Sequence, residues 1–323
     1  MSQNNDRRAF IKKGLTTAAG IGLLSKTETL VKAEKLAARI MSNTIPKRKL
    51  GKSSYDVSLL GLGGQATLEN PNRQDEAIEI INRAIDLGVN YIDTAPAYGG
   101  GISETYIGEV MQYRRNEVFL ATKTHNRWYN GTMQLFEESL ERLKTDYIDL
   151  YQLHDVRSQV ALDRIFHPRG AIHALEELKN TGVVKNIGIS GHFDPAILKK
   201  AIEQYDFDCI LMALNAADIH HLPFQYGLFD AAVKRNLGII AMKIPARRKI
   251  FRSDGITSME QALGYVYSFP ISSAIIGIRS LNELEKNVEI TRNFRNFNDQ
   301  QLNELEQLTS HYYEDASYFK DHS

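Results

Sequence analysis

The sequence has a single cysteine, Cys209, in 323 residues. One thiol cannot form a disulfide within the chain, which excludes a fold held together by disulfides. Cys209 opens the apolar run CILMALN, which favours a buried small hydrophobic side chain over a reactive thiol.

Lysine and arginine together number 39, as do aspartate and glutamate, so the formal net charge is zero. Nothing in that balance favours binding to nucleic acid or to an anionic surface.

The sequence also lacks the usual signs of a metal site or of a hydrolase. His220 and His221 have no third metal-type ligand at a suitable spacing, so we expect no metal ion. We expect no pair of carboxylates near the cleft, which disfavours a hydrolase or isomerase that acts without a nucleotide. With 43% hydrophobic residues the chain can bury a large core, and its length suits a single domain.

The chain begins with a segment that resembles a twin-arginine (Tat) export signal. Paired arginines in DRRAFIK, residues 6–12, precede an apolar stretch, 14–24, that is too short to span a membrane. A basic amphipathic helix is the alternative interpretation. Small residues near position 33 favour cleavage after Ala33, and no cysteine there could carry a lipid anchor.

These features divide the chain into three parts. We expect a signal peptide at 1–33, a linker at 34–46, and the folded domain with a C-terminal tail at 47–323. The expected location is periplasmic, or otherwise exported by the Tat machinery, with no stable membrane anchor in the mature form.

Three apolar segments of the folded domain each run into a polar residue. Residues 91–98, YIDTAPAY, contain Asp93 and end at Tyr98; VFLATK ends at Lys123, and YIDLYQLH ends at His154. If these segments are consecutive parallel strands separated by helices, their polar ends meet at one edge. We therefore expect all four side chains to face one cleft.

This set of residues suits proton transfer at a carbonyl group. A phenol with a pKa of about 10 is a weak acid near neutrality, and a neighbouring ammonium lowers that pKa. Lys123 can supply the charge, Asp93 can hold the lysine, and His154 can orient a carbonyl or relay its proton. Each residue alone is more simply a cap, a solvated charge or a packing residue. Their order along successive strands favours catalysis.

The order Asp93, Tyr98, Lys123, His154, in the text DTAPAYGGGISE, LATK and LYQLH, resembles the aldo-keto reductase family. The similarity extends from the segment RKLGKS, which begins at Arg48, to Asn287. It implies a single-domain (β/α)8 TIM barrel, an α/β fold, that binds an extended nicotinamide cofactor and transfers a hydride. It also implies that Tyr98 is the general acid and base, assisted by the other three residues.

The expected barrel strands and helices follow from hydrophobic runs and from capping and turn residues. Strands are predicted at 57–63, 89–93, 118–123, 147–154, 183–191, 238–243 and 273–278, with another in the run from Cys209. Helices are predicted at 75–87, 132–143 and 171–180, with Ser103 as a helix cap. The tail is predicted to be helical to about Leu308. The family resemblance implies that the rest of the tail folds over the barrel mouth, and a disordered end is the alternative.

The same resemblance implies a set of cofactor contacts. Ser190 matches a position that binds the nicotinamide amide, and a basic loop after residue 243 matches one that binds pyrophosphate. The segment GIRS, together with a later asparagine, resembles the family's adenosine-binding pattern. The implied contacts are Ser190, Asn215, Lys243, Arg247, Gly277, Arg279, Ser280, Glu283 and Asn287. Arg279 favours the 2′-phosphate of NADP and Glu283 opposes it, so NADP is preferred and NAD stays open.

Three positions differ from those of the family. Members commonly have asparagine after the serine, glutamine in the sixth strand and tyrosine at its end, where this chain has Gly191, Met212 and Asn215. These differences keep open a non-catalytic barrel that binds a nucleotide or a sugar. The leading interpretation is a carbonyl or sugar-alcohol oxidoreductase. Because the leader predicts export, we also expect its cofactor to be loaded before export and held tightly.

Overall fold

The computed structural model of the protein describes residues 44–320. The expected signal peptide, most of the expected linker and the last three residues lie outside this described part. No helix within it is long and apolar enough to cross a membrane.

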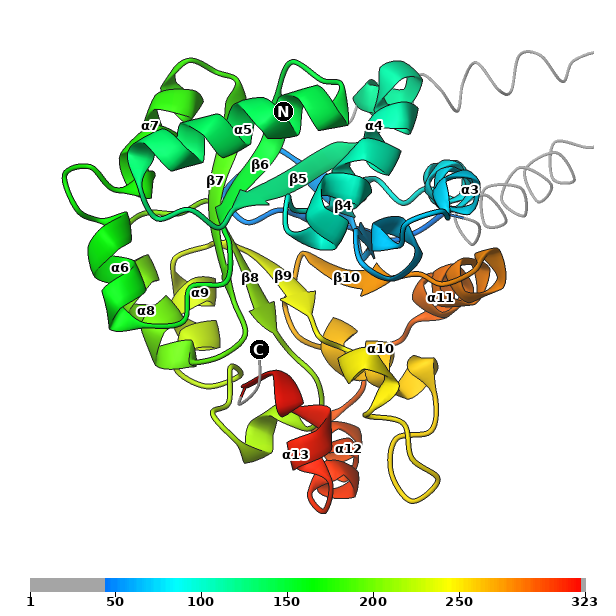
Figure 1. The fold of residues 1–323 in the computed structure, drawn as a ribbon. Coiled ribbons are helices and arrows are strands. Elements are labelled where there is room, and N and C mark those ends of the chain that lie inside the picture. Colours follow the sequence, from blue (N-terminus) through cyan, green and yellow to red (C-terminus); the bar gives the residue numbers. More distant parts are fainter. Residues whose placement is uncertain (1–43, 321–323) are drawn as a thin grey trace, which may run out of the picture. The chain divides into compact units, whose positions relative to one another are not determined.

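Eight parallel strands close into a barrel with helices around it (Figure 1). The strands are β3 (Leu60–Gly63), β4 (Tyr91–Asp93), β5 (Phe119–Thr124), β6 (Ile148–Leu153), β7 (Val184–Gly191), β8 (Cys209–Ala213), β9 (Gly238–Met242) and β10 (Ser273–Gly277). Strand β10 pairs with both β3 and β9, which closes the circle. The predicted (β/α)8 fold is confirmed, and all eight carboxyl ends lie at the same end of the barrel.

A two-stranded hairpin precedes the barrel. Strands β1 (Lys47–Lys49) and β2 (Asp56–Ser58) pair antiparallel, and Leu50 packs with Tyr91 in the core inside the barrel. The prediction of one strand over residues 57–63 was therefore wrong. The chain leaves the hairpin after Ser58, whose hydroxyl donates to the carbonyl of Leu60, and enters the barrel as β3.

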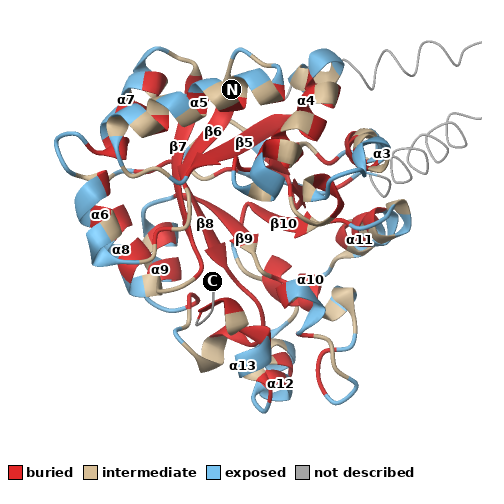
Figure 2. Ribbon diagram, viewed as in Figure 1, coloured by how far each residue is buried: buried red, intermediate tan, exposed pale blue. Residues whose placement is uncertain are grey.

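The helices alternate with the strands and bury one face against them (Figure 2). They are α3 (Gln74–Asp86), α4 (Ile102–Arg114), α5 (Tyr129–Leu143), α6 (Gln159–Ile165), α7 (Ala171–Asn180), α8 (Pro195–Gln204), α9 (Leu228–Lys234), α10 (Met259–Tyr267), α11 (Leu281–Asn293), α12 (Asp299–Thr309) and α13 (Tyr313–Ala316). The predicted helices at 75–87, 132–143 and 171–180 correspond to α3, α5 and α7. Ser103 is not a cap, because α4 begins one residue earlier and Ser103 is buried against Thr94.

The strands separate two buried cores, since alternate side chains point to opposite faces. In β8, Cys209 and Leu211 point into the barrel, where they pack with Ile240. Met212 belongs to the larger core between the strands and the helices. The burial of Cys209 raises the pKa of its thiol, consistent with a packing role.

Candidate active site

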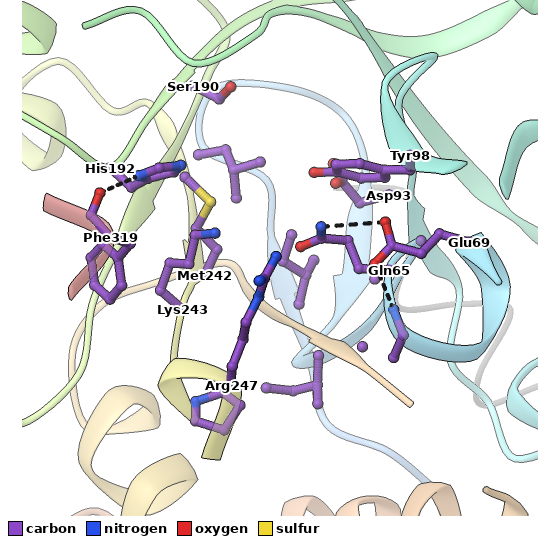
Figure 3. Close-up of a pocket in the computed structure, with 18 of the residues that line it drawn as sticks. Gln65, Glu69, Asp93, Tyr98, Ser190, His192, Met242, Lys243, Arg247 and Phe319 are labelled. Atoms are coloured by element: carbon purple, nitrogen blue, oxygen red, sulfur yellow. Dashed lines mark hydrogen bonds between the residues drawn. The ribbon is translucent and has the colours of Figure 1, made fainter. Parts of the chain in front are cut away.

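A cavity of about 550 Å³ opens at the carboxyl ends of the strands (Figure 3). Its lining includes Asp93, Tyr98, Lys123 and His154, the four residues that the sequence predicts to converge. In a barrel of this kind, residues at the carboxyl ends of strands commonly form the active site.

A buried ion pair lies at the base of the cavity. Lys123 on β5 and Asp93 on β4 are both fully buried, and the ammonium bonds to one oxygen of that carboxylate. The other oxygen accepts a hydrogen bond of 3.0 Å from Gln152 on β6. The ammonium also donates to the carbonyl of Thr94 at 2.7 Å. Because several partners share each charge, the lysine side chain is held in one position.

Tyr98 lies directly above this pair. Its hydroxyl is 3.5 Å from the ammonium of Lys123. The turn that follows consists of Gly99, Gly100 and Gly101, with φ of 61°, 64° and 95°. A β-carbon at Gly99 would lie 2.4 Å from the carbonyl oxygen of Glu69, so this turn requires glycine. The glycine cluster thus lets the chain present Tyr98 to the cavity and then start α4.

The pKa of Tyr98 differs in direction from the sequence-based expectation. Burial raises the pKa of its phenol, and the Lys123 ammonium only partly offsets that effect. For Lys123, burial disfavours the charge, but Asp93 and Tyr98 outweigh it and raise the pKa of the ammonium. The expected influence of Lys123 is present, but desolvation of the phenol is larger. Tyr98 is therefore a protonated phenol near neutral pH.

His154 is an uncharged neighbour of the phenol. Its ring meets that of Tyr98 edge to face, with 5.7 Å between the centroids. Burial, followed by the charge of Lys123, lowers the pKa of His154 well below its usual range. A neutral imidazole beside a neutral phenol suits the binding of a polar but uncharged group such as a carbonyl.

Two basic residues project toward the cavity from the segment after β9. Lys243 and Arg247 line it, and neither forms an ion pair or a side-chain hydrogen bond within residues 44–320 (Figure 3). Lys243, Ala246, Arg247 and Arg248 all have positive φ, between 44° and 74°. Such strain in residues other than glycine concentrates at functional sites. Unpaired cations on a constrained loop fit the phosphates of a dinucleotide.

The structure brings only some of the predicted cofactor residues to the cavity. Ser190, Gly277 and Arg279 line it together with the two basic residues. Asn215 does not, because its side chain bonds to the backbone of Ala217 and Lys243.

The other three predicted cofactor residues lie in α11 or cap it. Ser280 caps this helix, and Glu283 accepts a 2.9 Å bond from the backbone of Arg279. Asn287 is buried in the helix, and its amide nitrogen has no hydrogen-bond partner within the described residues. None of the three lines the cavity, and a cofactor role for them stays a prediction.

The floor of the cavity corrects one position in the sequence analysis. In β8, the sixth strand of the barrel, the residue that lines the cavity is Leu211. Met212 faces the helices instead. The alternation along β8 places every second residue inward, so the register could have been read from Cys209. With Met242 and Ile275, Leu211 gives the site an apolar floor.

Sequence reasoning missed several other lining residues. Gln65 and Glu69 follow β3, Asp155 follows His154, and His192 follows β7. Glu69 and Asp155 bring carboxylates to the cavity in addition to Asp93, so the expectation of no carboxylate pair near the cleft was wrong. Only the positions of Asp155 and His192, directly after strand ends, carried a sequence signal.

The C-terminal tail completes the wall of the cavity. Tyr318 and Phe319 line it, and the carbonyl of Phe319 lies 3.2 Å from Nδ1 of His192. The next residue, Lys320, is fully buried and pairs with the buried carboxylate of Asp218. Of the two tail arrangements left open by the sequence, the structure shows, up to residue 320, a tail that packs at the barrel mouth and lines the cavity.

Comparisons with known proteins agree with this geometry. A sequence profile of the Aldo/keto reductase family matches residues 59–247, which is more than half of the chain. The uncharacterized oxidoreductase YqkF of Bacillus subtilis is 30% identical over 305 residues, covering 81% of this chain and 96% of that protein. The holo form of the aldo-keto reductase AKR11C1 of Bacillus halodurans is similar, with a TM-score of 0.69 and 26% identity, covering 82% of this chain and 96% of that one.

A fourth comparison concerns the fold alone. An aldo-keto reductase from Klebsiella pneumoniae, solved in complex with NADPH, has a TM-score of 0.69 at 20% identity, covering 82% of this chain and 96% of that one. The barrel, the order of the predicted catalytic residues along it and these matches are consistent with one another. The chain therefore belongs to the aldo/keto reductase family and is a nicotinamide-dependent oxidoreductase.

Proposed function

We propose that the protein interconverts a carbonyl compound and its alcohol, with Tyr98 as the general acid and base. The observation that carries this proposal is the position of the Tyr98 hydroxyl, 3.5 Å from the buried ammonium of Lys123 at the wall of the cavity. A sugar or sugar alcohol is the substrate class that we favour.

Each catalytic side chain has a separate part in the proposed reaction. The nicotinamide, when bound, supplies a hydride to the carbonyl carbon or accepts it from the alcohol carbon. In the reduction, the hydroxyl of Tyr98 gives its proton to the carbonyl oxygen, which becomes the alcohol. Lys123 then stabilises the phenolate by its charge, and Asp93 keeps Lys123 in place. Neutral His154 orients the carbonyl oxygen.

We infer a preference for NADP over NAD. Arg279 is exposed just before α11, and Arg247 lies in the loop after the neighbouring strand β9, so two cations are available to phosphate groups. The carboxylate of Glu283, which would oppose a phosphate, is bound to the backbone N–H of Arg279.

Arg279→Met should weaken binding of NADP+ more than that of NAD+, measured by titration calorimetry. Equal weakening of the two would contradict the preference.

We further propose that the leader directs export through the Tat pathway, with the cofactor bound beforehand. The paired Arg7 and Arg8 and the apolar stretch that follows support this, and they lie outside the described residues. Tat export carries folded proteins, so a cofactor bound in the cytoplasm would travel with the enzyme. A cofactor that stays bound must return to its starting oxidation state without leaving the enzyme. This favours a substrate that can both reduce and reoxidise it.

The catalytic assignment is tested by Tyr98→Phe. The variant keeps the ring but loses the transferable proton, so we expect turnover to fall by about 10²–10⁴-fold. The affinity for NADPH should stay within about twofold, because the hydroxyl contributes to chemistry rather than to binding. Leu308→Ala, on the exposed side of α12, is the matched surface control. Normal turnover by Tyr98→Phe would refute the assignment.

A further inference from the structure

Two polar side chains in the cavity are not used by the proposed proton transfer. Asp155 follows the loop end of β6, and His192 follows β7 directly. Both line the cavity that also contains Tyr98, and Figure 3 shows His192 in it. They come from neighbouring strands, and Nε2 of His192 lies 3.6 Å from Oδ1 of Asp155.

The carboxylate of Asp155 is held firmly but is only half satisfied. Its backbone has a φ of 52°, its N–H donates to the hydroxyl of Ser190 at 3.0 Å, and its carbonyl accepts from Arg127 at 3.0 Å. Oδ2 accepts a 2.6 Å bond from Nε of Arg157. Oδ1 is buried and has no hydrogen-bond partner within residues 44–320. A buried carboxylate oxygen without a donor is unfavourable, so this oxygen, on a residue that lines the cavity, calls for a partner.

The tautomer of His192 follows from its other contact. Nδ1 lies 3.2 Å from the carbonyl oxygen of Phe319, and a carbonyl can only accept, so Nδ1 carries the hydrogen. Burial and the charge of Lys243 lower the pKa of His192 to about 4. The ring is therefore neutral near pH 7, and its Nε2 presents a lone pair.

Two hydrogen-bond acceptors thus face each other with no donor between them. The nearby hydroxyl of Ser190 cannot serve, because it donates to the carbonyl of Leu153 at 3.2 Å. We propose that Oδ1 of Asp155 and Nε2 of His192 form an acceptor pair that binds an N–H or O–H donor of a ligand in this cavity. This proposal rests on the proposed function, which supplies the two candidate ligands.

Both candidate ligands carry the required chemistry. The carboxamide of nicotinamide has an NH₂ group, whose two N–H bonds match two acceptors. A polyhydroxylated substrate has hydroxyl groups next to its carbonyl. The shared property is a neutral donor, and an anionic group at this point would be repelled by Asp155. The pair therefore selects for orientation of the ligand as well as for its presence.

Two variants remove the pair in different ways. Asp155→Asn replaces the free oxygen by an amide that can itself donate to Nε2 of His192, which fills the site from within the protein. His192→Asn keeps a donor for the carbonyl of Phe319 but deletes Nε2. Leu308→Ala, the exposed surface variant used above, is the control, because it leaves Asp155, His192 and Arg157 unchanged.

The experiment measures binding first and turnover second. NADP+ and its 3-acetylpyridine analogue, which lacks the NH₂ group, are titrated into the purified full domain after removal of bound nucleotide. The KM of a hydroxylated carbonyl substrate, found by screening the unmodified enzyme, is then measured against that of its deoxy analogue. Loss of a charged or buried acceptor should weaken binding of the ligand that supplies the donor by about 10- to 100-fold.

The outcomes separate the two ligands and the two proposals. If both variants weaken NADP+ but not the analogue, the cofactor supplies the donor. If NADP+ binding is unchanged and the KM rises only for the hydroxylated substrate, the substrate supplies it. If neither changes, or Leu308→Ala has the same effect as the two variants, the acceptor pair is refuted. Failure of the unmodified protein to bind NADP+ or to turn over would instead refute the proposed function.

Discussion

At the scale of single residues, the predicted catalytic groups converge because strand ends in a parallel barrel share one end. That topology placed Asp93, Tyr98, Lys123 and His154 together from sequence order alone. The protonation of Tyr98 was not predictable in the same way. Its pKa depends on how much water the folded cavity excludes, and burial outweighs the nearby ammonium.

The raised pKa of Tyr98 predicts opposite pH profiles for the two directions of reaction. Reduction needs the phenol, which stays protonated below pH 10, so its kcat/KM should be flat from about pH 6 to pH 9. Oxidation needs the phenolate, so its kcat/KM should rise with pH over that range, by about tenfold per unit. Steady-state rates in both directions measure this. A reduction rate that falls with an apparent pKa near 7 would contradict the raised pKa.

The pair of Asp155 and His192 shows what spacing alone cannot reveal. Their contact depends on a positive φ at Asp155 and on a carbonyl supplied by Phe319, 127 residues from His192 along the chain. A sequence pattern carries neither fact. The contact between Asp155 and His192 was therefore not predictable from the sequence.

At the scale of elements, the strands and helices were predictable because hydrophobic periodicity and capping residues are local. The single strand predicted at 57–63 was an exception. This apolar run contains the end of β2, which belongs to the hairpin, and all of β3, which belongs to the barrel. The position of the tail at the barrel mouth was not predictable either. The tail is held by an ion pair between Lys320 and Asp218, which are about a hundred residues apart in the sequence. No local sequence pattern indicates such a pair.

Removal of the tail ion pair should destabilise the protein. Besides Asp218, Lys320 donates to the carbonyls of His221 at 2.5 Å and Leu222 at 3.0 Å. Lys320→Met leaves a buried carboxylate without its cation, so we expect a loss of about 3–5 kcal/mol in the free energy of unfolding, measured with urea.

The double variant Lys320→Met, Asp218→Asn should recover part of that stability, because it no longer leaves an isolated charge. Lys286→Met, on the exposed face of α11, is the control and should change stability by less than about 0.5 kcal/mol. A Lys320→Met variant as stable as this control would show that the ion pair does not fix the tail.

At the scale of the whole molecule, the barrel supplies a rigid support and the loops at one end supply the chemistry. Fold class was predictable because the resemblance covers most of the folded domain. Substrate choice was not, since it depends on the cavity wall, to which the tail contributes Tyr318 and Phe319.

Export is a property of the whole chain and is tested by the arginine pair. Arg7→Lys with Arg8→Lys keeps the charge but removes the paired guanidinium groups, so we expect the protein to remain in the cytoplasm. Cell fractionation measures this, and nucleotide analysis of the unmodified exported protein tests cofactor loading. Unchanged export of the lysine variant, or an exported protein without nucleotide, would contradict the respective proposal.

The central claim is hydride transfer between the nicotinamide and a carbonyl carbon beside Tyr98. The most direct test supplies NADPH deuterated at the transferring position of C4, with a panel of aldehydes and ketoses, and locates the label by NMR. We predict one deuterium on the former carbonyl carbon with the unmodified enzyme, and none above background with Tyr98→Phe. Absence of label from every product of the unmodified enzyme, or equal labelling by Tyr98→Phe, would contradict the account.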